Sequence, residues 1–157
     1  MRFTIAAVGR IGGGRGKGSE ARALFDEYAG RIGTPLVLKC CEEKRKLPLA
    51  ERKRSEAELL FKLVPKGALV VALDRHGKAY ASADFARLVG SWRSRGAKDV
   101  CFLIGGADGL DDSAISRAAL VLSLGPMTWP HLLVPALLAE QLFRAESILA
   151  GHPYHRE

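Results

Sequence analysis

The sequence has few of the residues that hold disulfide-rich or zinc-bound proteins together. Its 157 residues include only three cysteines, Cys40, Cys41 and Cys101, and no two of them have C-x-x-C spacing. Common zinc and redox motifs need that spacing, and disulfide frameworks belong to oxidising compartments. We therefore expect no metal site and no disulfide, and interpret the three residues as free thiols that fill a core.

Long apolar runs are also missing. No run approaches the roughly 18 residues that a membrane span requires, and the apolar stretch near the start is too short for a signal peptide. The composition, with 48% hydrophobic and 26% charged residues, is that of an ordinary globular chain. These features predict a cytoplasmic protein with one domain over residues 1–157 and no membrane contact.

Apolar and amphipathic segments alternate along the chain, which is typical of the α/β class. We expect a parallel sheet with helices on both faces. The expected strands are 3–8, 36–40, 68–73, 100–104 and 121–124, and the expected helices are 19–31, 48–64, 82–95, 112–119 and 133–150. Ser19 and Ser82 are interpreted as N-caps of their helices.

Positive charge is concentrated in the first part of the chain. Residues 1–66 contain 15 Lys and Arg against 8 Asp and Glu, whereas residues 67–157 contain 9 of each. Such an asymmetry favours a polyanionic partner, with nucleic acid as the first candidate. The alternative is a basic surface that only keeps the protein soluble.

The glycine-rich segment 9–18, GRIGGGRGKG, follows a strand and precedes a helix, as a phosphate-binding loop would. The P-loop pattern fails because Ile11 stands at its first glycine and Gly18 at its Ser/Thr position. The G-x-G-x-x-G pattern fails in every register. The segment is therefore interpreted as a flexible loop that contacts an RNA backbone, or as a plain surface loop, and its charged residues are Arg10, Arg15 and Lys17.

A second basic cluster lies at the start of the helix expected at 48–64. Alone it would be read as a solvated helix face, but together with the first loop it favours RNA contact. Such contacts position a protein on the RNA backbone and do not read its sequence. The residues are Lys44, Arg45 and Lys46, followed by Arg52, Lys53 and Arg54.

Three segments, 73–77, 104–110 and 124–129, are expected as loops at the carboxyl ends of parallel strands. Open α/β sheets bind ligands at this edge, and glycines there let a ligand approach the backbone. Each segment alone could be an ordinary turn. Together they predict a small-molecule pocket.

Five motifs carry a resemblance to a known family. They are L-D-R-H-G-K at 73–78, L-I-G-G-A-D-G-L at 103–110, L-S-L-G-P-M-T-W-P-H at 122–131, and A-E-Q-L-F-R-A followed by H-P-Y-H-R-E at the end. Over its full length the chain resembles the small SPOUT-class methyltransferases that methylate N3 of a pseudouridine in large-subunit ribosomal RNA. The resemblance implies methylation of 23S rRNA on the assembled 70S ribosome.

The resemblance also implies a fold, a cofactor and a partner. These are a SPOUT-type α/β knot with a C-terminal trefoil knot, S-adenosylmethionine as methyl donor without a metal, and a homodimer whose RNA site is shared between subunits. Carried over by position, the residues expected to bind the donor are Leu73, Gly105, Leu124, Gly125, Pro126, Met127, Thr128 and Trp129.

The reaction must remove the N3 proton of the base and place N3 in line with the donor methyl. We expect Tyr154, His155 and Arg156 to form the catalytic group, without assigning the proton acceptor. Histidine is the residue type that most often transfers protons at neutral pH, so His152 and His155 are the candidates for this step. The alternative is that this tail only packs against the partner subunit. Glu140 is interpreted as a structural ion pair with Arg144.

One departure from the family concerns Pro135, where related sequences commonly have arginine. Proline inside a helix costs about 3 kcal/mol or more, but it is tolerated in the first turn, so we expect the last helix to begin near this residue. The missing basic contact supports one alternative function: a non-catalytic RNA- or ribosome-binding protein that retains the SPOUT fold.

Overall fold

The computed structural model describes residues 1–12 and 15–156. Gly13 and Gly14, which belong to the glycine-rich segment, and Glu157 lie outside the described residues.

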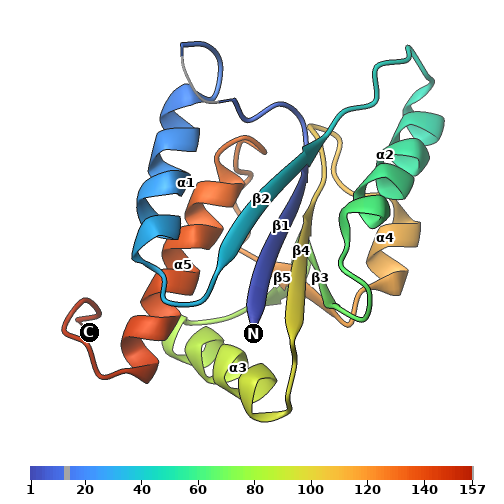
Figure 1. The fold of residues 1–157 in the computed structure, drawn as a ribbon. Helices are drawn as coiled ribbons and strands as arrows, with labels where there is room; N and C mark the ends of the chain where they lie inside the picture. The colour runs from blue at the N-terminus through green and yellow to red at the C-terminus, as the bar shows by residue number, and fades with distance from the viewer. Residues whose placement is uncertain (13–14, 157) are drawn as a thin grey trace.

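In the described part of the chain, five strands form one parallel sheet in the order β2-β1-β4-β3-β5 (Figure 1). The central strands β1 and β4 are buried almost throughout, as a parallel sheet covered on both faces requires. The predicted α/β class is confirmed. The strands are β1 (Arg2–Val8), β2 (Leu36–Cys41), β3 (Leu69–Ala79), β4 (Asp99–Ile104) and β5 (Leu120–Ser123).

Helices cover both faces of the sheet, because side chains alternate along each buried strand. Phe3 and Ile5 of β1 pack into the larger core with α1, α3 and α5, whereas Ala6 and Val8 belong to a smaller core with α2 and α4 (Figure 1). Helix α5 lies between α1 and α3. The helices are α1 (Ser19–Arg31), α2 (Leu49–Leu63), α3 (Ser82–Ser94), α4 (Asp112–Arg117) and α5 (Val134–Leu149). Within the described residues, no helix has the length and apolar character to cross a membrane.

Helix starts differ from two predictions and agree with one. Neither Ser19 nor Ser82 is an N-cap, because α1 and α3 begin at these residues and the caps are Gly18 and Ala81. The hydroxyl of Ser82 instead bonds a side chain of α5. Helix α5 begins at Val134 with Pro135 in its first turn, as predicted.

The prediction of three core thiols is only partly correct. Cys101 is fully buried in β4, but Cys40 is exposed on the edge strand β2 and Cys41 is half-buried. Cys40 and Cys41 differ in exposure because neighbouring side chains of a strand point to opposite faces of the sheet, and the edge strand β2 is covered on one face only. Burial raises the pKa of the Cys41 thiol to about 11 and that of Cys101 to about 12.

Strand β3 continues beyond the loop that was expected at 73–77. Leu73 and Lys78 both pair with Leu122 of β5, so the intervening residues form an irregularity inside the strand. At Gly77 the two backbones are in close contact: an added Cβ would lie 2.7 Å from the carbonyl carbon and oxygen of Val121. A Cβ on Gly105 would lie 2.5 Å from the carbonyl carbon of Gly109. Both positions require glycine, and the trefoil knot stays a prediction.

The close passage at Gly77 predicts a large effect of a single methyl group. Gly77→Ala is expected to lower the free energy of unfolding by about 1–3 kcal/mol, because backbone atoms of β5 would have to move. Gly30→Ala is the matched control: this glycine of α1 has no atom within 4 Å of an added Cβ, and alanine should stabilise the helix by about 0.5 kcal/mol. Urea unfolding followed by circular dichroism measures both. Equal stability of the two variants would contradict the close approach of the two backbones.

Candidate active site

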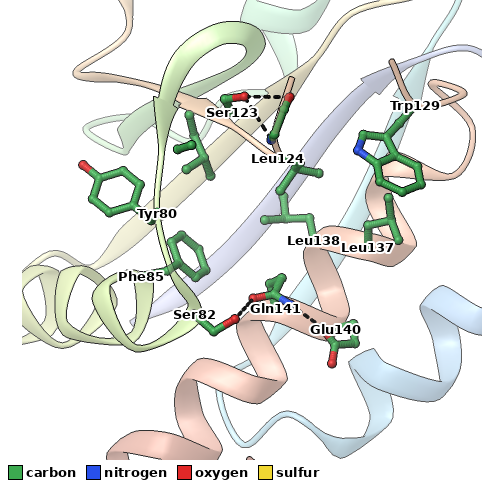
Figure 2. Close-up of a pocket in the computed structure, with 13 residues that line it drawn as sticks. Tyr80, Ser82, Phe85, Ser123, Leu124, Trp129, Leu137, Leu138, Glu140 and Gln141 are labelled. Carbon is green, nitrogen blue, oxygen red and sulfur yellow. Dashed lines mark hydrogen bonds between the residues drawn. The ribbon is translucent and has the colours of Figure 1, made fainter. Parts of the chain in front are cut away.

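A cavity of about 440 Å³ lies where the end of β5 meets α3 and α5 (Figure 2). Its walls are mostly apolar, with Phe85, Leu138 and Trp129 among them, and Glu140 and Gln141 contribute polar groups at one end. Apolar clefts with few polar groups are typical binding sites for small molecules. The lining residues are Ala79, Tyr80, Ser82, Phe85, Leu122, Ser123, Leu124, Gly125, Trp129, Leu137, Leu138, Glu140 and Gln141.

Ser123 holds two chain segments together at this cavity. Its buried hydroxyl lies 3.1 Å from the carbonyl oxygen of Arg75 and 3.1 Å from that of Gly125, and it accepts a hydrogen bond from the amide of Gly125. The irregular part of β3 and the loop after β5 are thereby fixed relative to each other. Gly125 has a φ of 109°, and nothing lies within 4 Å of an added Cβ, so the backbone of the loop is open to a ligand.

The cavity includes only some of the residues predicted to bind the methyl donor. Leu124, Gly125 and Trp129 line it. The other five do not: Leu73 pairs with β5, Gly105 contacts its own turn, and Pro126, Met127 and Thr128 are exposed on the loop. For all eight, donor binding stays a prediction.

Sequence reasoning did not identify several lining residues. Tyr80, Phe85 and Leu137 belong to no motif, since they reach the cavity through the packing of α3 and α5 against the end of β5. The A-E-Q-L-F-R-A motif contains Gln141 and was the one available signal for this wall.

Glu140 connects the cavity to the C-terminal tail. One carboxylate oxygen, Oε1, accepts hydrogen bonds from Nε of Arg144 at 3.0 Å and from the hydroxyl of Tyr154 at 3.0 Å. The other, Oε2, accepts from Gln141 at 2.7 Å, and Gln141 in turn accepts from Ser82. The predicted ion pair between Glu140 and Arg144 is confirmed, with N and O 2.5 Å apart.

Tyr154 is held from several sides. Its ring centroid is 4.6 Å from that of Phe143, and the guanidinium groups of Arg144 and Arg31 lie 4.8 and 5.2 Å from it. Burial in this cluster, with the bond to Glu140, raises the pKa of the Tyr154 hydroxyl well above its usual value. Tyr154 is therefore a hydrogen-bond donor at neutral pH.

The remaining residues of the tail are more open. His155 is half-buried, with Nδ1 3.4 Å from Nη1 of Arg144, and Arg156 is exposed. The structure thus brings Tyr154 and His155 together around Arg144, although neither lines the cavity. His131 lies against the end of β1, where its Nε2 would be 3.2 Å from a Cβ on Gly9.

The two basic segments follow β1 and β2 and therefore lie at the same edge of the sheet (Figure 1). Arg15, Lys17, Lys44 and Lys46 are exposed, and Arg10 is exposed with a long contact of 3.8 Å to Glu42. Arg45, which was also predicted to contact RNA, is already paired with Glu43.

Arg45 bonds Glu43 in its own loop, with 2.9 Å between Nη2 and Oε2, and its amide also donates to Glu43. Ser55 of α2 donates to the same carboxylate. The hydrogen bonds from Arg45 and Ser55 hold the pKa of Glu43 far below its usual range. Arg45 therefore stabilises the loop that carries Lys44 and Lys46.

Comparison with known proteins agrees with this architecture. The family described as "Predicted SPOUT methyltransferase" matches residues 1–155. Proteins named "Ribosomal RNA large subunit methyltransferase H" are 53% identical in Rhodospirillum centenum, 54% in Paramagnetospirillum magneticum and 47% in Rhizobium leguminosarum, each over 99% of both chains.

Among solved structures, a probable methylase family protein from Haemophilus influenzae superposes with a TM-score of 0.55 at 12% identity. The match covers 99% of this chain and 70% of that one, and it shows a shared fold. The family match and the full-length relatives establish that the chain belongs to the SPOUT methyltransferase family.

Proposed function

We propose that the protein uses S-adenosylmethionine to methylate N3 of a pseudouridine in 23S rRNA within the assembled 70S ribosome. The observation that carries the proposal is full-length identity above 50% to proteins named as large-subunit rRNA methyltransferases. The tail sequence H-P-Y-H-R at 152–156, linked to the cavity through Glu140, supports it. A ribosomal substrate would place the protein in the cytoplasm, acting as one domain over 1–157.

The cavity fits the proposed donor. Trp129 and Leu124 offer apolar surface, and the open space beside Gly125 lets a ligand approach the backbone closely. When bound, the donor supplies a methyl group activated by positive sulfur, and transfer leaves the C–S electron pair on sulfur. The residues of this chain bind it and hold the start of the 124–129 loop through Ser123.

A homodimer with a shared site is the second part of the proposal. Helix α5 runs from the edge that carries the 124–129 loop toward the opposite edge, where the tail emerges (Figure 1). In one chain Tyr154 packs against Glu140, and none of the described tail residues 152–156 lines the cavity. Met127 and Trp129 are 69% and 39% exposed beside the cavity. A second copy would cover this apolar surface and bring its tail to the donor.

The alternative, a non-catalytic RNA- or ribosome-binding protein, was suggested by Pro135. The structure gives this residue another role, since it is fully buried in the first turn of α5. A residue in this position contributes to packing. The proline therefore offers no support for a loss of catalysis.

The proposal is tested by transfer of labelled methyl from S-adenosylmethionine to intact ribosomes that lack the modification, with free 23S rRNA alongside. We expect label at N3 of a pseudouridine, on ribosomes and not on free RNA. Binding to ribosomes with no label from a folded dimer would replace the proposal with the non-catalytic alternative.

The shared site is tested by complementation between two inactive variants. Arg156→Ala removes a tail cation, and Leu124→Arg blocks the cavity wall. A purified heterodimer of the two contains one intact tail facing one intact cavity, so we expect about half of the wild-type activity from one of two sites. Each homodimer should remain dimeric by size exclusion and stay inactive. A heterodimer as inactive as both parents would show that each site lies within one chain.

The loop after β2 predicts that neighbouring basic residues contribute unequally to ribosome binding. Lys44→Ala with Lys46→Ala is expected to weaken ribosome binding and to reduce the slope of log affinity against log salt by about 0.7–0.9 for each phosphate that is no longer neutralised. Arg45→Ala is the matched control, because this side chain is paired with Glu43 and should change the slope little. Filter binding across salt concentrations measures both. If Arg45→Ala changed the slope more than the double lysine variant, Arg45 and not the two lysines would be the residue that neutralises RNA phosphates.

A further inference from the structure

In both histidines of the tail, Nδ1 lies within hydrogen-bond distance of a nitrogen atom of the protein. The backbone amide of Tyr154 donates to Nδ1 of His152, with 3.2 Å between the nitrogens. Nη1 of Arg144 faces Nδ1 of His155 at 3.4 Å. An amide and a guanidinium have only hydrogens to give, so Nδ1 must be the acceptor at both histidines. Each imidazole then carries its hydrogen on Nε2.

Arg144 is held firmly enough to impose this arrangement on His155. Its Nε and Nη2 bond Oε1 of Glu140 at 3.0 and 2.5 Å, and its guanidinium lies over the ring of Tyr154. The remaining nitrogen, Nη1, is the one that faces His155. A protonated imidazole has hydrogens on both nitrogens. In a protonated His155, the hydrogen on Nδ1 would face Nη1 of Arg144, which has no lone pair to accept it. The two positive groups would then move apart.

The other polar side chains of the tail are donors as well. The hydroxyl of Tyr154 donates to Glu140, and the guanidinium of Arg156 has no acceptor atom. Within residues 151–156, the contacts at Nδ1 of His152 and His155 therefore place the hydrogen of each neutral ring on Nε2, so neither histidine has a ring nitrogen left to take a proton.

We propose that the tail stabilises the anion of the target base as a set of hydrogen-bond donors, and that no tail histidine accepts the base's proton. The inference rests on the proposed function. N3 gives its proton to water and bonds to the methyl carbon as the C–S bond breaks. Negative charge meanwhile spreads from N3 to the two flanking carbonyl oxygens. Nε2–H of His155 donates to one of these oxygens, as donors do in an oxyanion hole, and Arg144 is the positioning residue that fixes its tautomer.

The tautomer is measured directly in the full-length dimer. Long-range ¹H–¹⁵N correlation spectra of histidine-labelled protein at neutral pH are expected to show the Nε2–H form for His155, assigned by comparison with His155→Gln. Arg144→Met should remove this preference. Arg87→Met is the matched control, because Arg87 forms an exposed pair with Asp84 on α3. An Nδ1–H form or an imidazolium in the wild type would overturn the proposal.

The methyl-transfer rates of two His155 variants show whether this residue acts as a hydrogen-bond donor or as a base. His155→Gln keeps an N–H near the position of Nε2 but has no basic nitrogen. We expect it to retain methyl transfer within about tenfold of wild type, whereas His155→Ala should reduce the rate about 10²–10³-fold, as for other oxyanion-hole donors. Equal reduction in both variants would overturn the proposal. If the wild-type protein transfers no methyl group, the proposed function is refuted. The spectra would still show whether Nε2 of His155 carries the hydrogen.

Discussion

The close passage of β5 against the irregular part of β3 is the constraint on which the site depends. At Gly77 the backbones leave no room for a side chain, and the hydroxyl of Ser123 joins the carbonyl of Arg75 to the loop that starts at Gly125. The start of the loop after β5 is therefore held at the cavity that α3 and α5 line, whereas residues 126–128 are exposed. The cavity exists because of this close passage, since its floor is Leu122 to Gly125 and its walls are the two helices.

Helix α5 transmits this arrangement to the rest of the molecule. Its first turn, with the buried Pro135, follows the loop, and Glu140 and Gln141 face the cavity from its middle. Glu140 also holds Arg144 and Tyr154. A single carboxylate thus sets the position of the tail relative to the cavity wall. Such a network is costly to disturb, because any member without its partner is left as a partly buried polar group.

Much of the fold could be predicted from the sequence, because it depends on local patterns. Apolar runs identified the five strands, and the first-turn rule for proline placed the start of α5 correctly. The irregularity in β3 could not be predicted, since it arises when Lys78 pairs with a residue more than 40 positions away. Leu124, Gly125 and Trp129 were found by motif, but Tyr80 and Phe85 line the cavity only through tertiary packing. For the tail, the residue types alone predicted a catalytic group but not the role of each member. The contact between Arg144 and His155 is what indicates which nitrogen of the ring carries the hydrogen.

Positive charge and the cavity are arranged around the same edge of the sheet. In a parallel sheet the loops after β1, β2 and β5 emerge on one side, so Lys17, Lys44 and Lys46 share that edge with the 124–129 loop. Glu43 reduces the local excess by pairing Arg45, but the pair also orders the loop that displays the lysines. Under the proposed function, these lysines would bind the RNA backbone beside the cavity, and no separate RNA-binding domain would be needed. Because backbone contacts carry no sequence information, the proposed function assigns discrimination of the target base to the tail and the cavity.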